Sequence, residues 1–322
     1  MIAFVVRRFA GAGIVLFAIS ILVFLMFFAT PGIDPAARIA GKNASPQTLL
    51  QVRQAFGLDQ PLWTRYVRLM QHLFVSRDLT SYVNHGQQVI PEINKALPVT
   101  ISLAVGSAVI WMLAATVMGV LAAKHRGGSV DSAIMLMGIF GVSLPVYWLS
   151  EVTNLITQDR LHDSIFHWVP ALGYVSLTHD PWQWALHLLF PWLTLAVLYA
   201  GIYARMLRGE LLTALDEDYV RTARAKGVSE RRILLRHALR CSMIPVISVF
   251  GLDFGTLVGG SALLTEVVFG LPGIGLLTYH ALQNLDLPMI MATVMYAAAF
   301  VVLTNALVDL LYARLDPRVP NA

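Results

Sequence analysis

The chain has 322 residues, of which 57% are hydrophobic and 13% are charged. Soluble domains carry roughly 25% charged residues, so this composition excludes a water-soluble fold and indicates apolar surface that faces lipid. The formal charge of +4 at pH 7 does not favour a nucleic-acid partner, because basic residues in such a chain are first explained by membrane orientation. The single cysteine, Cys241, cannot form an internal disulfide.

The apolar residues fall in blocks of about 20, the length that an α-helix needs to cross a bilayer core of about 30 Å. The sequence therefore predicts an all-α membrane protein with six transmembrane helices, which cover residues 9–29, 99–122, 132–156, 184–204, 242–265 and 289–312. The first block follows Arg7 and Arg8, as in a signal peptide. It is longer than the usual apolar region of about 7 to 15 residues, so we expect a retained span.

Polar segments separate the expected spans and flank them at residues 1–8, 30–98, 123–131, 157–183, 205–240, 266–288 and 313–322. Segment 30–98 contains an amphipathic helix between Ser45 and Asp59. Segment 266–288 contains the glycine-rich stretch 269–275, for which we expect a re-entrant turn at the outer membrane face.

Basic residues set the expected orientation. Most of the 23 lysines and arginines lie in segments 1–8, 123–131, 205–240 and 313–322, which an even number of spans places on one side of the membrane. Cytoplasmic loops carry an excess of Lys and Arg, so the N- and C-termini are expected in the cytoplasm. The segments 30–98, 157–183 and 266–288 are then extracytoplasmic.

Residues 205–240, here called the basic hairpin, are patterned like folded helices. Apolar positions recur at helical spacing at Leu211, Leu212, Leu215, Tyr219, Val220 and Ala223. Gly227 stands where this helix would end, and Ser229 is placed to cap a second helix that runs through Leu239. A rigid hairpin of this kind can transmit motion from a docked partner, whereas a floppy loop would absorb it.

The stretch Asp218–Gly227 resembles the coupling-loop motif of bacterial ABC (ATP-binding cassette) importer permeases, in the variant of the peptide and nickel branch. The family pattern is Glu-Ala-Ala, three residues and then Gly. Here Arg221, Thr222 and Ala223 take the leading positions and Gly227 keeps the spacing, while the absent glutamate points toward the peptide branch. The resemblance implies contact with an ATPase through Asp218, Tyr219, Arg221, Thr222, Ala223, Arg224, Lys226, Gly227 and Arg231.

Further matches to the same branch are spread over nearly the whole chain, at 57–62, 97–100, 187–195 and 266–275, whereas 77–81 is a weak match. The chain is similar to the first (B-type) permease of dipeptide and oligopeptide importers. The resemblance implies the type I ABC importer permease fold, with a permease domain at about 95–315 and a cytoplasmic coupling helix between spans four and five.

By this resemblance the chain would import di- and oligopeptides by alternating access across a bacterial plasma (inner) membrane. Its partners would be a second homologous permease in a heterodimer, two ATP-binding cassette ATPases, an extracytoplasmic peptide-binding protein and membrane lipid. ATP and Mg²⁺ would bind in the ATPases, so this chain would hold no cofactor and no catalytic residue. Consistently, no stretch fits Gly, four residues and Gly-Lys-Ser/Thr.

Ionisable residues inside a membrane are costly and are functional hypotheses by default. Asp253 lies near the middle of the fifth span, and Glu151 and Asn154 lie about one turn apart at the end of the third. These residues can line a path for peptide termini, or they can be hydrogen-bonded contacts between helices or permeases. The sequence leaves both interpretations open.

Two other acids have plainer expected roles. Asp309 lies close to Arg314, which favours a structural ion pair, and Glu266 at the outer end of the fifth span is expected to reach water.

The alternative function is a proton-coupled secondary peptide transporter, with Asp253 or Glu151 as the proton carrier. That class is expected to show internal duplication and not a docking hairpin. An ABC permease for nickel or another small solute is a further alternative. The 9 histidines show no metal-ligand spacing, and no histidine sits at a revealing spacing from Ser107 or Ser261, the serines that follow glycines in the expected spans. We therefore expect neither a metal site nor an intramembrane enzyme.

Overall fold

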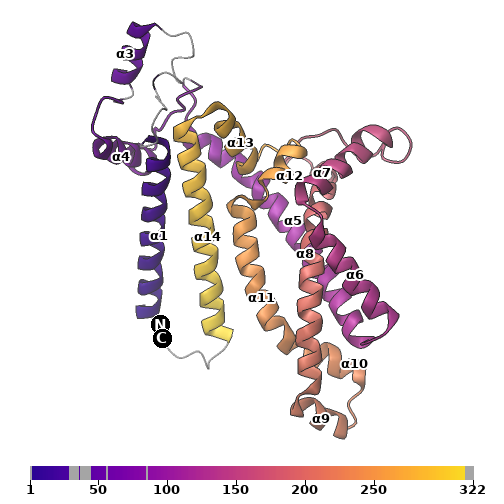
Figure 1. Ribbon diagram of the computed structural model, residues 1–322. Coiled ribbons are helices and arrows are strands. Elements are labelled where there is room, and N and C mark those ends of the chain that lie inside the picture. The colour runs from indigo at the N-terminus through magenta and orange to yellow at the C-terminus, as the bar shows by residue number, and fades with distance from the viewer. Residues whose placement is uncertain (1, 29–35, 37–44, 56, 85, 316–322) are drawn as a thin grey trace. The chain divides into compact units, whose positions relative to one another are not determined.

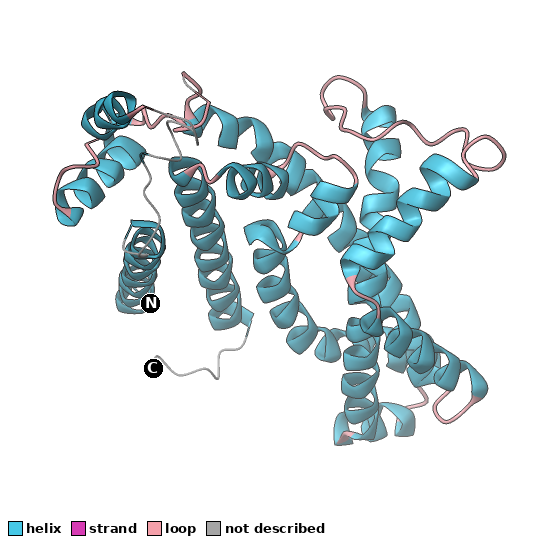
Figure 2. Cartoon of the chain, turned by 45° about the horizontal axis from the view of Figure 1, so that its top comes forward, coloured by secondary structure: helices cyan, strands magenta, loops and turns pink. Residues whose placement is uncertain are grey.

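The computed structural model describes residues 2–28, 36, 45–55, 57–84 and 86–315. These residues form helices and loops, and the one extended pairing among them is an antiparallel bridge between Thr80 and Gln88 (Figure 2). The expected all-α fold is confirmed for this part of the chain. The helices divide into two compact units, of which Met1–Pro98, Val258–Leu263 and Pro272–Ala322 form the first and Val99–Leu257 and Leu264–Leu271 the second.

The first unit is built on two long antiparallel helices, α1 (Ile2–Phe28) and α14 (Leu287–Leu315), which pack along each other (Figure 1). The N-terminal end of α1 and the C-terminal end of α14 therefore lie at the same end of the pair. The remaining helices of this unit are α3 (Pro46–Ala55), α4 (Leu62–Gln71), the π-helical turn η1 (His72–Ser76), the start of α5 (Val89–Lys124) and α13 (Ile274–Asn284). The helix expected between Ser45 and Asp59 is α3.

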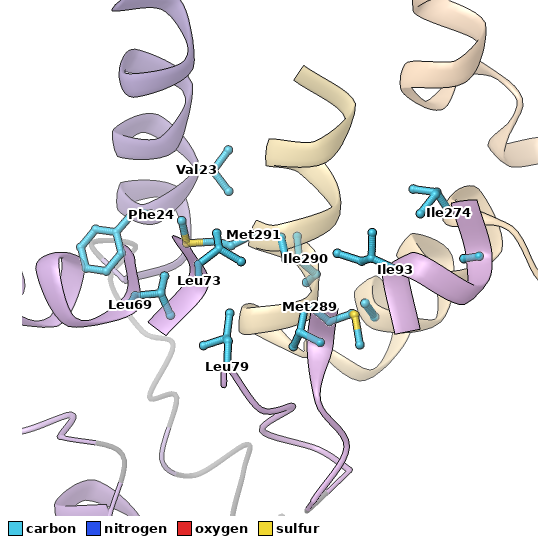
Figure 3. Close-up of a cluster of buried hydrophobic side chains, with 14 of the residues drawn as sticks. Val23, Phe24, Leu69, Leu73, Leu79, Ile93, Ile274, Met289, Ile290 and Met291 are labelled. Carbon is cyan, nitrogen blue, oxygen red and sulfur yellow. The ribbon is translucent and has the colours of Figure 1, made fainter. Parts of the chain in front are cut away.

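An apolar cluster holds this unit together. It brings Val23 and Phe24 of α1 against Leu69 of α4 and Leu73 of η1, and it includes Ile290 of α14 (Figure 3). The loop before α5 is tied to the same unit by a buried carboxylate. Asp286, 4% exposed, accepts hydrogen bonds from the hydroxyl of Ser81 and from the backbone N–H of Tyr82 (3.1 Å). Loop and helices thus form one packed body.

The second unit contains the rest of α5 and the helices that follow it. They are α6 (Ser129–Ser143), α7 (Val146–Asn154), η2 (Leu155–Arg160), α8 (Pro181–Asp216), α9 (Asp218–Ala225), α10 (Glu230–Arg232), η3 (Ile233–Ala238), α11 (Leu239–Thr256) and α12 (Leu263–Val268). A π-helical segment, η4 (Leu257–Ser261), follows α11 at the boundary of the units.

Four helices among the described residues are long and apolar enough to cross a membrane: Val89–Lys124, Pro181–Asp216, Glu230–Ser261 and Leu287–Leu307. A fifth span is possible if α6 and α7, which are bent by 92° at their junction, count as one. The described apolar part of α1, Ala10–Met26, is shorter. The protein is therefore a multi-pass membrane protein, and the count of six spans stays a prediction.

The helices differ from the expected spans in several places. The second span begins at Val89 and not at residue 99. The third span is not straight, because Leu144 precedes Pro145 and takes an extended conformation that ends α6. The fourth helix does not end at Ala204 but continues to Asp216. The fifth span is broken at Gly260, whose φ of 133° lies outside the helical range and is accessible to glycine.

Small residues let α6 and α8 approach closely, as is common between membrane helices. A Cβ on Gly201 would lie 2.6 Å from the Cα of Gly138, and a Cβ on Gly141 would lie 2.8 Å from the carbonyl oxygen of Val197. Gly106 of α5 likewise accommodates the ring of Trp192. These contacts fix the framework from which the basic hairpin projects.

Candidate functional site: the basic hairpin and a membrane carboxylate

The basic hairpin begins as a direct continuation of α8. The helix runs unbroken to Asp216, and Glu217 then takes an extended conformation (φ −74°, ψ 153°) before α9 starts. Beyond the turn, α10 passes through η3 into α11 without a gap. The second helix of the hairpin is thus the first part of the fifth span and not a separate element.

One buried face anchors α9. Val220 is fully buried and is the one buried residue of this helix. α9 contacts both α8 and η3, where Leu211 and Ile233 are also fully buried. Burial of a valine side chain stabilises a contact by about 1.5–3 kcal/mol. The helix is therefore attached through a single apolar anchor.

The turn of the hairpin is closed by a glycine and by an ion pair. Gly227 has a φ of 75°, a left-handed conformation that glycine adopts without steric cost. Arg224 and Glu230 bridge the turn with two hydrogen bonds, Nε to Oε1 at 2.7 Å and Nη2 to Oε2 at 3.2 Å. The hydrogen bonds to Glu230 raise the pKa of the Arg224 guanidinium. Ser229 is at the N-cap position, but its side chain makes no capping hydrogen bond, so that detail of the expectation is wrong.

The residues that resemble the coupling motif gather on the exposed side of this hairpin. Tyr219 is 41% exposed, and the Arg221 side chain, 73% exposed, is held only by a long contact of 3.5 Å to Asp218. The other exposed members are Asp218, Thr222, Arg224, Lys226, Gly227 and Arg231, and Ala223 is half-buried. The structure therefore brings all of them together on α9, the turn and α10.

Two ion pairs join the hairpin end of α8 to the loop between α5 and α6 and to the first turn of α6. Arg126 lies 3.8 Å from Asp216, and Arg208 makes two hydrogen bonds of 2.5 and 2.6 Å to the carboxylate of Asp131. Asp131 is buried and also accepts a hydrogen bond from the backbone N–H of Gly127. The basic loop 124–128 and the basic hairpin thus lie at the same end of the second unit.

A second polar feature lies inside the helices of this unit. Asp253 of α11 accepts a hydrogen bond of 2.7 Å from the hydroxyl of Tyr203 of α8. The buried ring of Trp111 stacks on Tyr199, with ring centroids 4.6 Å apart, and also contacts Tyr203 and Phe250. The candidate carboxylate is therefore joined to an aromatic cluster from α5, α8 and α11, which sequence reasoning did not identify.

Comparison with known families decides the identity of this helical framework. A family model described as "binding-protein-dependent transport system inner membrane component" matches residues 115–321, and the model of its N-terminal region matches residues 1–104. The chain belongs to this family. It is thus a permease, a membrane-embedded component of a binding-protein-dependent transport system in the inner membrane.

Relatives of this permease match it along its whole length. A protein of Brucella abortus (strain 2308), named as a peptide transport system permease, is 39% identical over 319 residues and covers 99% of both chains. A protein of Sinorhizobium fredii, named as a peptide ABC transporter permease, is 35% identical over 98% of both chains. The glutathione transport system permease GsiC of Escherichia coli O6:H1 is 36% identical over 99% of both chains. The expected family resemblance is confirmed.

The other polar residues predicted in the permease have different surroundings. Glu151 is exposed on α7, and Asn154 reaches the carbonyl oxygen of Val268 at 3.4 Å. In the described part of the chain no hydrogen bond or ion pair joins either residue to Asp253. Glu266 does not reach water, because it is fully buried and accepts a hydrogen bond of 2.7 Å from Thr100. The side chains of Asp309 and Arg314 lie outside the described residues.

Proposed function

We propose that this permease is the membrane subunit of an ATP-driven importer of short peptides, and that α9 is the helix on which an ATPase subunit acts. The observation that carries the proposal is the form of α9: one buried anchor at Val220, and an exposed face with the residues that resemble the coupling motif. An exposed charged helix with a fixed position is suited to a docking protein, whereas a solvated connector needs no such anchor.

The way the hairpin is attached supports a mechanical role. α9 lies between the end of α8 and the beginning of the helix that becomes α11. Arg208 of α8 is clamped to Asp131 at the start of α6 by a bidentate pair, an arrangement that adds geometric specificity as well as energy. Motion imposed on α9 would thus reach α8 and α11 directly and α6 through the clamp. Transmission to the membrane helices is what alternating access requires.

In the proposed orientation the basic hairpin, the basic loop 124–128 and both termini face the cytoplasm. The ion pairs of Arg126 with Asp216 and of Arg208 with Asp131 support this, because they place two basic segments at one end of the second unit. The partners would be a second homologous permease in a heterodimer, two ATPase subunits and an extracytoplasmic binding protein. ATP and Mg²⁺ would bind in the ATPases, and this chain would perform no chemical step.

The cargo is proposed to be a di- or oligopeptide because relatives that match the whole chain carry the names of peptide and glutathione permeases. Asp253 supports a role in the path. An ionised carboxylate has about four acceptor positions, and among the side chains that the structure describes Tyr203 is the one hydrogen-bond donor to Asp253. A carboxylate in a membrane helix requires further partners, and the ammonium group of a peptide N-terminus is one that fits. The aromatic cluster beside it offers faces for such a cation.

Transport by the complete importer in reconstituted vesicles tests the proposal. Peptide uptake should require ATP and the ATPase subunits, and it should persist when the proton gradient is dissipated. Uptake that needs only a proton gradient would favour a secondary transporter with Asp253 or Glu151 as the proton carrier. Uptake of nickel and not of peptides, under the same conditions, would retain the ATP-driven permease but reject the cargo.

A further inference from the structure

The short helix α4 and the turn η1 carry an apolar strip that no part of their own unit covers. Trp63, Val67 and Phe74 are 65%, 44% and 57% exposed, and their spacing puts them on one face. A contiguous strip of exposed apolar side chains marks a surface that another molecule or a membrane covers.

The opposite side of α4 is cationic, and a third side is packed. Arg65, Arg68 and His72 line a polar pocket together with Asp78. Tyr66 is buried against α1, where it makes edge contacts with the rings of Phe17 and Phe24. A helix with one packed side, one apolar side and one cationic side has the pattern of a segment that lies in the plane of a membrane interface.

The apolar strip and α1 enclose a groove of about 700 Å³. Its walls are largely apolar side chains, among them Leu16, Phe17, Trp63, Val67, Met70 and Phe74. The Ser20 hydroxyl in its wall donates to the carbonyl oxygen of Phe17 at 2.7 Å, so at the 2.6 Å contact with Tyr66 it must accept the tyrosine proton. Because an ordered water needs two to four polar partners, the groove is suited to a hydrocarbon chain and not to water.

The position of the groove along α1 also suits a lipid. The apolar run at α1 covers residues 9–29 of the sequence, directly after Arg7 and Arg8, and 21 helical residues are about 32 Å long, close to a hydrocarbon core of about 30 Å. Phe24, whose ring contacts Tyr66 of α4, lies five residues before the C-terminal end of this run, or about 8 Å below it. α4 therefore contacts α1 within the depth of about 5–10 Å at which interfacial helices bury their apolar faces.

We propose that this groove binds an acyl chain of a membrane phospholipid, with α4 and η1 lying in the interface and Arg65 and Arg68 facing the phosphate groups of the lipid headgroups. Trp63 and Tyr66 stack with ring centroids 5.7 Å apart, and such aromatic rings favour the interfacial level. The groove continues onto the exposed side chains of α1, since Phe17 also lines a second apolar hollow with Ile14 and Leu22. The lipid would belong to the outer leaflet, and only this choice of leaflet rests on the proposed orientation.

Photolabelling tests the lipid site in the complete importer embedded in vesicles. The probe is a phosphatidylglycerol with a photoactivatable group in the middle of one acyl chain, and the labelled residues are mapped by mass spectrometry of peptides. The label should concentrate on Phe17, Val67 and Phe74, several-fold above Leu113, an exposed leucine of α5 outside the groove.

Two matched variants make the test specific. V67W fills the groove with an apolar ring, and its groove label should fall to the level of Leu113, whereas L113W should leave the groove label unchanged. Equal labelling of the groove and of Leu113 in the unmodified protein, or an unchanged groove label in V67W, overturns the proposal. The proposal is also overturned if the groove stays unlabelled and a photoreactive amino acid at position 67 cross-links to the partner permease or to a second copy of this chain. ATP-driven peptide uptake in the same vesicles tests the proposed function separately.

Discussion

Replacing Gly227 by valine perturbs the basic hairpin at its turn without a steric clash. Gly227 has a φ of +75°, and nothing lies within 4 Å of the position that a Cβ would occupy. The left-handed conformation costs an L-residue about 1–2 kcal/mol, and a β-branched side chain is the least tolerant of it. This strain corresponds to a factor of about 5–30 in the ratio of formed to broken turns. We expect G227V to fold and to dock poorly with the ATPase.

The assay measures ATP hydrolysed per peptide imported by the complete importer in vesicles. G227V should raise this ratio, because hydrolysis no longer moves the membrane helices, and G227N should restore it, because asparagine tolerates the left-handed region. Gly86 provides the matched control: its φ is +89° and its surroundings are also open, but it lies in the loop before α5, in the first unit. Wild-type coupling in a folded G227V importer, or an equal loss in G86V, would refute the role of the turn.

Further substitutions probe the anchor, the ion pair and the membrane carboxylate. V220A should weaken the attachment of α9 by about 2 kcal/mol, since two buried methyl groups are lost. Hydrogen exchange of the α9 amides should then accelerate, while exchange of the α8 amides stays unchanged. The reversals R224E and E230R should each disturb coupling, and the double reversal should recover it; no recovery would mean that the pair does not hold the turn. D253N keeps an acceptor for Tyr203 but removes the charge. The KM for peptides with a free amino terminus should rise roughly 10- to 100-fold, because a charged hydrogen bond worth about 1.5–3 kcal/mol is lost. The KM for N-acetylated peptides should be unchanged.

Hydrophobic block length was sufficient to locate the apolar helices, because a bilayer demands continuous apolar runs of a fixed length. It could not show where those helices bend or end. The 92° bend between α6 and α7 lies at Pro145, which disfavours a helical conformation at Leu144 but does not set the direction of the following helix. The extension of α8 to Asp216 follows from packing of Leu207 and Leu211, which are buried although they lie in a charged stretch. Tertiary contacts decided these boundaries.

Sequence reasoning reached local features of the candidate site and not those that depend on distant residues. Spacing placed Gly227 at a helix end, where its φ is positive, whereas the exposed residues of α9 were proposed from the resemblance to the coupling motif. The partner of Asp253 is Tyr203, 50 positions away, and the partner of Glu266 is Thr100, 166 positions away. Nothing in the sequence near Glu266 indicates a buried hydroxyl partner, so its expected exposure to water was wrong. Such pairs appear only once the helices are packed.

The continuity of two helices links the hairpin to the carboxylate. α8 has 36 residues and is about 54 Å long, so it extends well beyond a hydrocarbon core of about 30 Å. The same helix holds Tyr203, and its end leads into α9; the helix that begins at Glu230 leads to Asp253. The hydrogen bond between Tyr203 and Asp253 therefore joins the two arms of the hairpin again inside the second unit. A displacement of α9 that moves the two arms unequally has to strain or break this bond, which would couple docking at the hairpin to the polar pair in the proposed path.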